Sequence, residues 1–189
     1  MLKKSILPIL FSLSLLFTGC NNDEKIKTID KANSVVSTGE YILTSTDNKQ
    51  FTVKREKDGF LVKEAKGKIV IFDIFATWCP PCKAVATHLT SLQKKYKNDI
   101  LVIGITIEDG ITNEKLEMFK KENNLDYILV NSSQNRAVIT EIADELKLGG
   151  RFPIPIMAIY KDGKYVVHYV GAVEEEFIDS DIKKALGKK

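Results

Sequence analysis

Two cysteines separated by two prolines, Cys79 and Cys82, stand between stretches of different periodicity. The preceding residues 68–75 are mostly β-branched and aromatic, which predicts a short strand buried on both faces. After the pair, apolar residues recur at intervals of four, three and four, which predicts a helix packed on a sheet. Pro80 and Pro81 fall in the first turn, where proline costs a helix nothing. The pattern therefore places Cys79 at the N-terminus of a helix that follows a central strand.

This position suits thiol–disulfide exchange. The nucleophile in that reaction is a thiolate, which the positive end of a helix dipole favours. Two cysteines at this spacing can close a disulfide with little backbone movement, and the second can resolve a mixed disulfide formed on the first. We therefore interpret Cys79 as the attacking cysteine and Cys82 as the resolving cysteine of a redox-active disulfide.

A zinc site is the alternative, since Cys-x-x-Cys also occurs in metal-binding knuckles. Such a site needs two further ligands, and only Cys20, His88 and His168 remain. None of them lies at knuckle spacing, so the redox interpretation is favoured. We expect no metal and no dissociable cofactor.

Residues 73–83, Asp-Ile-Phe-Ala-Thr-Trp-Cys-Pro-Pro-Cys-Lys, resemble the active-site stretch of the thioredoxin superfamily. The run Ala-Thr-Trp-Cys-x-Pro-Cys is similar to that of the TlpA/ResA/DsbE-like branch of membrane-anchored thiol–disulfide oxidoreductases. Residues 155–163 resemble the family's cis-proline, strand and Asp-Gly hairpin. The resemblance implies an α/β thioredoxin fold, with a central mixed β-sheet flanked by helices. It also implies an N-terminal β-hairpin and a TlpA-like helix–strand insert over residues 114–130.

Asp73 matches a buried aspartate that moves a proton at the second cysteine in thioredoxins, although TlpA-like proteins more often carry asparagine there. Its apolar neighbours indicate burial, which would raise its pKa into a range useful to a base. The alternative is an aspartate that reaches solvent at a strand edge.

The resemblance also implies a substrate-docking surface around the cysteines. Pro155 takes the place of the cis-proline, and the backbone of Ile154 would bind an extended substrate segment as an added strand. Trp78 is expected to cover the cysteines and contribute to docking, with core packing as an equally weighted alternative. The expected support and docking residues are Trp78, Pro80, Pro81, Ile154 and Pro155.

Glu108 and Asp109 follow the second predicted buried strand, residues 100–107, near the place where ResA-like proteins keep a functional acid. Solvated turn residues are the favoured interpretation of both. His88 and His168 are assigned no chemistry.

Residues 1–19 are predicted to be a lipoprotein signal peptide, with Lys3 and Lys4 ahead of an apolar run too short to span a bilayer. The sequence ending in Cys20 resembles a lipobox, with Phe17 where leucine is usual, and implies lipid attachment at Cys20. An ordinary signal peptide with an incidental cysteine is the alternative. Residues 20–39 read as a polar tether and residues 40–189 as the thioredoxin-like domain.

The net charge of +3 includes two lysines of the predicted signal peptide. Without them, 28 minus 2 leaves 26 basic residues against 25 acidic ones, which gives no sign of nucleic-acid binding. Periodicity, caps and turn residues predict the remaining elements. These are strands at 41–44, 50–54, 59–62, 127–130, 156–160 and 165–170, and helices at 114–124 (capped by Thr112 or Asn113), 134–148 (stopped by Gly149-Gly150) and 174–186.

Together these observations predict a monomeric, lipid-anchored, extracytoplasmic reductase of protein disulfides that faces the periplasm. The resemblance to the TlpA/ResA/DsbE-like branch implies a membrane electron donor of the DsbD/CcdA type and apocytochrome c as a client, as in cytochrome c maturation or periplasmic thiol homeostasis. Because Pro80 and Pro81 lack N–H groups, we expect only moderate stabilisation of the Cys79 thiolate and a potential at or below roughly −200 mV. An oxidase or isomerase, or a copper-binding module, stays open as an alternative.

Overall fold

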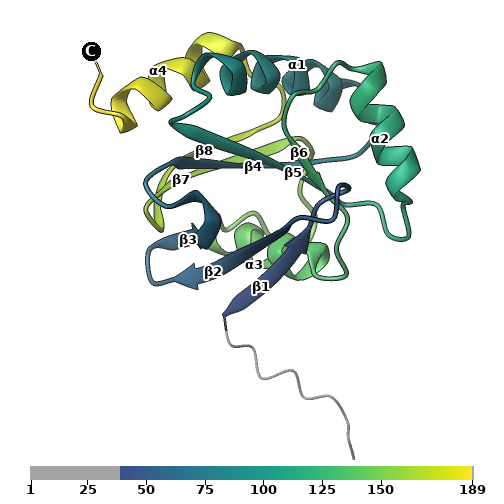
Figure 1. Ribbon diagram of the computed structural model, residues 1–189. Coiled ribbons are helices and arrows are strands. Elements are labelled where there is room, and N and C mark those ends of the chain that lie inside the picture. Colours follow the sequence, from purple (N-terminus) through teal and green to yellow (C-terminus); the bar gives the residue numbers. More distant parts are fainter. Residues whose placement is uncertain (1–38, 189) are drawn as a thin grey trace, which may run out of the picture. The chain divides into compact units, whose positions relative to one another are not determined.

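The computed structural model describes residues 39–188 (Figure 1). The predicted signal peptide, Cys20 and nearly all of the predicted tether lie outside the described residues. Within residues 39–188, no helix has both the length and the apolar character that crossing a membrane would require.

The main sheet contains five strands. In chain order they are β4 (Ile69–Phe75), β5 (Ile100–Thr106), β6 (Ile128–Val130), β7 (Ile156–Lys161) and β8 (Lys164–Val170). Their spatial order is β6-β5-β4-β7-β8, with β4 parallel to β5 and antiparallel to β7. The strand that leads to the cysteines is therefore at the centre of a mixed sheet, and the thioredoxin fold expected from the sequence is confirmed.

Helices cover one face of this sheet: α1 (Pro80–Lys95), α2 (Asn113–Glu122) and α4 (Glu175–Ala185). The other face carries α3 (Asn135–Glu145) and a second sheet, formed by β1 (Glu40–Thr44), β2 (Gln50–Glu56) and β3 (Gly59–Val62) (Figure 1). A short 3₁₀ helix, η1 (Lys63–Ala65), follows β3. The predicted N-terminal hairpin is present and is extended by one strand.

Strand β4 is buried along its whole length because it separates two apolar cores. Ile69, Ile71 and Phe75 point into the core beneath α1, α2 and α4, which we call the helical core. The intervening residues Val70, Phe72 and Ile74 point into the core shared with α3 and the second sheet. By the same alternation, Asp73 lies on the helical-core side.

Most helix boundaries agree with the sequence patterns. Helix α1 begins at Pro80, and the Thr112 hydroxyl caps α2 by accepting a hydrogen bond from Lys115 N–H at 3.2 Å. Helix α3 ends earlier than predicted, at Glu145 and not at Gly149-Gly150. Lys147 adopts a left-handed conformation with φ of 56° and stops the helix before the glycines are reached.

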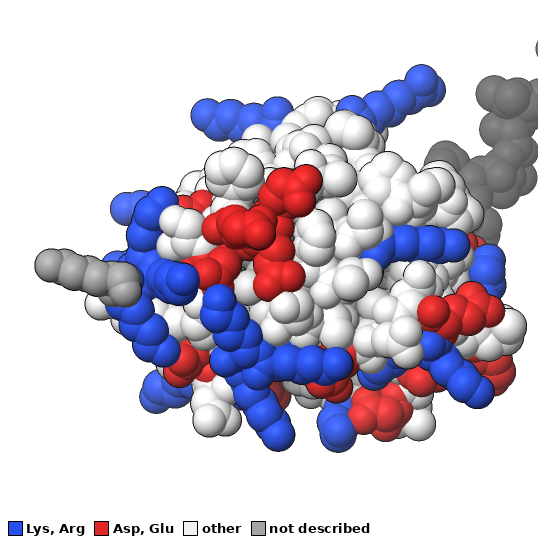
Figure 2. Space-filling model, turned by 90° about the horizontal axis from the view of Figure 1, so that it is seen from above, with Lys and Arg blue, Asp and Glu red and all other residues white. Residues whose placement is uncertain are grey.

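The outer surface of the helical layer is charged (Figure 2). One group of acidic side chains stands out on this face, further acidic side chains lie toward its edge, and lysines project between and around them. Helix α4 contributes Asp179, which pairs with Lys95 of α1 at 2.7 Å and with Lys183 at 2.8 Å. The face thus carries both signs of charge and is not a uniformly basic surface.

Candidate active site

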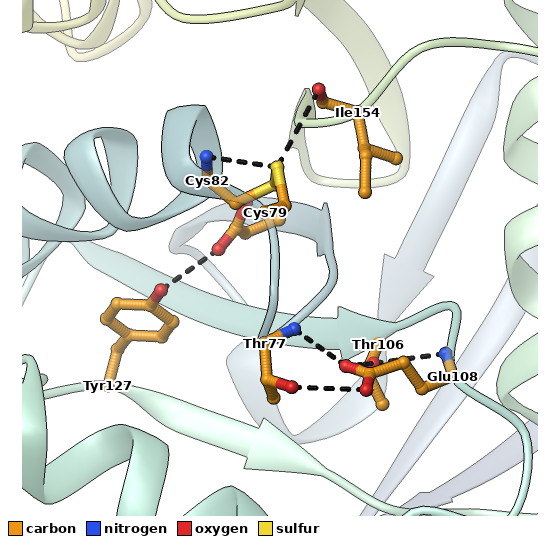
Figure 3. The surroundings of a disulfide bond; sticks show 8 residues. Thr77, Cys79, Cys82, Thr106, Glu108, Tyr127 and Ile154 are labelled. Carbon is orange, nitrogen blue, oxygen red and sulfur yellow. Dashed lines mark hydrogen bonds between the residues drawn. A yellow bond between two sulfur atoms is a disulfide. The ribbon is translucent and has the colours of Figure 1, made fainter.

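The two cysteines lie at the N-terminus of α1 and form a disulfide, with their Cα atoms 5.3 Å apart (Figure 3). Cys79 is the N-cap residue, and its Sγ accepts a hydrogen bond from the Cys82 N–H at 3.2 Å. Pro80 and Pro81 occupy the first two helical positions and have no N–H to donate. Cys82 is therefore the first backbone donor after Cys79, as the sequence predicts.

Both cysteines are nearly enclosed, with 4% of Cys79 and 1% of Cys82 exposed. The slightly greater exposure belongs to the residue that caps the helix. The attacking role of Cys79 stays a prediction.

The loop that precedes β7 lies against Cys79. The carbonyl oxygen of Ile154 is 4.0 Å from Cys79 Sγ and points toward it (Figure 3). Since the disulfide sulfur has no proton, this is a close approach and not a hydrogen bond. The Ile154–Pro155 peptide bond is cis, and the Pro155 carbonyl accepts a hydrogen bond from Gly171 N–H at 2.8 Å. The structure therefore brings together Cys79, Ile154 and Pro155, whose docking role stays a prediction.

Trp78 exposes 64% of its surface, so the alternative of simple core packing is wrong. An exposed indole directly before the attacking cysteine leaves its predicted docking role open.

Asp73 is completely buried, so the alternative of a solvent-reaching carboxylate is wrong. Its Oδ2 accepts a hydrogen bond from the Tyr127 hydroxyl at 2.9 Å, whereas its Oδ1 has no hydrogen-bond partner among the described residues. Burial raises the pKa of Asp73 from 3.8 to about 7, and the hydrogen bond from Tyr127 opposes this only in part. A carboxyl group with this pKa can both accept and return a proton near neutral pH.

Glu108 is a correction to the sequence analysis, because it is not a solvated turn residue. Its carboxylate accepts hydrogen bonds from the Thr77 N–H at 2.6 Å and the Thr77 hydroxyl at 3.1 Å (Figure 3). The Thr106 hydroxyl and the Lys115 ammonium group each lie 3.3 Å from it. Glu108 thus joins the segment just before the cysteines to β5 and α2.

These contacts also explain the acidity of Glu108. Burial raises its pKa, but the hydrogen bonds from Thr77 and the ammonium group of Lys115 outweigh that effect and hold the pKa below its ordinary value. Asp109 behaves differently: its side chain is 74% exposed and pairs with Arg136 on α3. The solvated interpretation therefore fits Asp109 and fails for its neighbour.

A recess of about 550 Å³ lies beside this site. It extends from the ends of β5 and β6 to the segment that leads into Ile154, and neither cysteine lines it. Its walls carry both apolar and basic side chains, including Ile139, Phe152, Arg136 and Arg151.

The two histidines take part in local contacts. His88 Nδ1 lies 3.0 Å from the Val173 carbonyl oxygen, and His168 Nδ1 lies 2.8 Å from the Tyr165 hydroxyl. In the described part of the chain, no three His, Cys, Asp or Glu side chains are grouped as a metal site would require.

Sequence reasoning missed Tyr127 and the connections of Glu108. Tyr127 stands at the start of an apolar segment, where its ring looks like an ordinary core residue. The burial predicted for Asp73 was the available signal. A buried carboxyl group needs a hydrogen-bond donor, and a tyrosine hydroxyl in another buried segment can supply one.

The chain resembles known thiol–disulfide proteins in sequence and fold. Residues 50–119 match the Thioredoxin family. The chain is 30% identical over 115 residues to the thioredoxin-like protein YneN of Bacillus subtilis, covering 61% of this chain and 63% of YneN. It is 27% identical over 124 residues to the thiol–disulfide oxidoreductase ResA of Bacillus thuringiensis subsp. konkukian, covering 65% of this chain and 66% of ResA. The match thus spans just under two thirds of each relative.

A solved structure gives the same result for the fold. The crystal structure of a thiol:disulfide interchange protein of the thioredoxin family from Chlorobium tepidum superposes with a TM-score of 0.62 at 21% identity, covering 79% of this chain and 94% of that one. The mixed sheet, the disulfide at the N-terminus of α1 and these similarities show a thioredoxin fold with a Thioredoxin-family match over residues 50–119, and ResA-like thiol–disulfide oxidoreductases are among the proteins to which the chain is similar.

Proposed function

We propose that this protein is an extracytoplasmic thiol–disulfide oxidoreductase that reduces protein disulfides. The observation that carries the proposal is the Cys79–Cys82 disulfide at the start of α1, beside the Ile154 carbonyl group and an exposed Trp78. This arrangement combines a reactive sulfur, a resolving sulfur and an adjacent backbone edge.

The reaction begins with the reduced protein. The Cys79 thiolate, stabilised by the Cys82 N–H and the start of α1, attacks a client disulfide and releases one client thiolate. Cys82 then gives its proton to Asp73 and attacks Cys79 Sγ, which restores the protein disulfide and releases the second client thiolate. Two electrons pass from the cysteine pair to the client, and the client thiolates take up protons from water. No dissociable cofactor takes part.

Client binding uses the loop that precedes β7. An extended client segment would pair with the backbone of Ile154, next to the cis peptide bond at Pro155, and would contact Trp78. Pro80 and Pro81 hold the start of α1 without adding N–H donors.

The direction of electron flow follows from how well the Cys79 thiolate is stabilised. A strongly oxidising disulfide requires a strongly stabilised thiolate, and here a single backbone N–H, that of Cys82, lies at hydrogen-bond distance from Cys79 Sγ among the described residues. We therefore propose a potential at or below roughly −200 mV, on the reducing side of the thioredoxin-to-DsbA range.

Equilibration of purified protein with glutathione or dithiothreitol buffers tests the direction. A potential near −120 mV, like that of DsbA, would instead support an oxidase using the same residues. If the Cys79–Cys82 pair cannot be cycled by such buffers at all, the oxidoreductase proposal is wrong. A copper titration of the reduced protein tests the binding-module alternative.

The resemblance to the TlpA/ResA/DsbE-like branch supports finer proposals. We place the protein on the periplasmic side of a bacterial membrane, held by a lipid on Cys20, with a membrane electron donor of the DsbD/CcdA type and apocytochrome c as a candidate client. A Cys82→Ser variant expressed in its own cell should trap donor and client as mixed disulfides on Cys79, which mass spectrometry can identify. Recovery of only unrelated abundant proteins would count against these partners.

A further inference from the structure

A glycine beside Asp73 explains how Tyr127 reaches it. Asp73 is paired with Gly104 in the β4–β5 ladder. A Cβ atom at Gly104 would lie 2.6 Å from Leu129 Cδ2, 3.1 Å from Tyr127 Cε2 and 3.2 Å from Phe75 Cε1. These separations are too short for ordinary contacts, so the missing side chain is what leaves room for the Tyr127 ring across β5. The fold thus contains a fitted position for this ring beside the buried carboxyl group.

The hydrogen bond from Tyr127 makes the two oxygens of Asp73 unequal. Oδ2 accepts the hydroxyl proton of Tyr127, whereas Oδ1 is equally buried and has no partner in the described part of the protein. A neutral carboxyl group has one carbonyl oxygen, which accepts hydrogen bonds, and one hydroxyl oxygen, which carries the proton. Because Oδ2 accepts the hydrogen bond from Tyr127, the proton of neutral Asp73 belongs on Oδ1. Asp73 faces the helical core, to which Cys79 and Cys82 both belong.

We propose that Tyr127 is a positioning residue for proton transfer: its hydroxyl holds Oδ2 of Asp73, so that Oδ1 alone exchanges the proton with Cys82. This inference rests on the proposed function. In the resolving step, the Cys82 S–H bond breaks and its proton moves to Asp73 Oδ1. The resulting sulfur forms a bond to Cys79 Sγ, and the bond between Cys79 and the client sulfur breaks. The client leaves as a thiolate, so two electrons have moved to it and the proton is retained on Asp73.

No other charged group competes for Asp73 in this core. Its strand neighbours are Gly104 on β5 and Met157 on β7, neither of which titrates. Helix α1 presents Cys82 on its buried side, and its lysines and histidine are exposed or half-buried. The charged residues of α2 and α4 lie on the exposed or half-buried sides of those helices, away from the buried apolar residues. Among residues 39–188, Tyr127 is thus the side chain that opposes the effect of burial on the pKa of Asp73.

The direction of the effect follows from the same contact. Burial raises the pKa of Asp73 and the Tyr127 hydroxyl lowers it, so removing the hydroxyl removes the opposing influence. A hydrogen bond to a charged group is worth enough to move the midpoint of Asp73 upward by about one to two pH units. At neutral pH this leaves about five- to fifty-fold less carboxylate available to accept the Cys82 proton.

The test is a Tyr127→Phe variant, which removes one oxygen and keeps the ring. Reduced protein is mixed with excess oxidised glutathione, quenched with acid, and analysed by mass spectrometry for the mixed disulfide and the closed disulfide between pH 5 and 10. In the variant, the midpoint of the resolving step should rise by about one to two pH units, and the mixed disulfide should accumulate at neutral pH. A ¹³C NMR titration of Asp73 in the oxidised protein should show the same shift.

Tyr96→Phe is the matched control. Tyr96 also lies in the helical core, and its hydroxyl donates to Asp179 at 2.7 Å on the outer side of the domain. This variant should keep the wild-type pH profile. In an Asp73→Asn background, adding Tyr127→Phe should change the resolving rate no further.

Three other outcomes are decisive. A Tyr127→Phe variant that resolves more slowly at every pH, with an unchanged midpoint, would overturn the positioning role and leave a purely structural one. If wild-type protein does not close its disulfide after reaction with glutathione, the proposed function itself fails. The inference alone fails when wild-type protein works and Tyr127→Phe retains its profile.

Discussion

Replacing Asp73 with asparagine should stabilise the oxidised protein by an amount that depends on pH. The folded protein holds the Asp73 proton until about pH 7, whereas the unfolded chain releases it near 3.8. Between these values the folded state binds the extra proton, so the wild-type protein loses stability as pH rises through this window. Each pKa unit corresponds to 1.36 kcal/mol, so a shift of about three units costs the wild-type protein about 4 kcal/mol above pH 7.

Asparagine is a close match in shape to a neutral aspartic acid. Its side-chain oxygen can still accept the Tyr127 hydroxyl, and its amide group replaces the unpartnered Oδ1. Below pH 4 the two proteins should therefore have the same free energy of unfolding. From pH 4 to 7 the difference should grow in favour of the variant, and above pH 7 it should stay at about 4 kcal/mol.

Urea unfolding of both oxidised proteins from pH 3.5 to 9, followed by far-ultraviolet circular dichroism, measures the difference. Asp109→Asn is the matched control, because the exposed Asp109 should give a difference below about 0.5 kcal/mol at every pH. A stability difference for Asp73→Asn that is the same at pH 4 and pH 8 would refute the reasoning.

Three further predictions concern other parts of the chain. Glu108→Ala should lower the free energy of unfolding by about 2 kcal/mol in urea titrations, because it leaves the Thr77 N–H without its acceptor. Asp109→Ala is the control and should change it by less than about 0.5 kcal/mol. Equal effects would show that the hydrogen bonds of Glu108 contribute nothing. In the reduced protein, Cys79 should react with iodoacetamide faster than Cys82 at neutral pH. Cys79→Ser should abolish disulfide reduction, whereas Cys82→Ser should stall as a mixed disulfide. Faster labelling of Cys82 would reverse the assigned roles. Cys20→Ala should move the protein from the membrane to the soluble fraction or leave its leader uncleaved, and a correctly cleaved variant that stays on the membrane would contradict lipid anchoring.

The sequence predicts well those elements whose signals are local. The run from Ile69 to Phe75 is apolar except for Asp73, and the two prolines fix the start of α1, so the strand, the helix and the placement of Cys79 between them were predicted correctly. The end of α3 was misplaced because Lys147 adopts a left-handed conformation that is usual for glycine, and nothing in its residue type signals this.

The contacts that complete the site have no local signal. Tyr127 is 54 positions from Asp73, and Glu108 is 31 positions from Thr77. Each contact requires that two segments far apart in the sequence be aligned with each other to within one residue. Glu108 and Asp109 are adjacent and similar in character, yet one turns inward and the other outward. Both residues lie in the loop after β5, where the tertiary contacts with Thr77 and Arg136 decide the direction and composition gives no signal.

The position of Trp78 gives the protein a built-in optical reporter. It is the only tryptophan in the chain, it precedes a redox-active sulfur, and 64% of its surface is already exposed in the folded protein. The emission of an exposed indole should shift toward the blue when a docked client covers the ring. Global unfolding, by contrast, should change the wavelength of its emission very little, because the indole starts out in water. A single dye-free signal can therefore follow client docking separately from unfolding.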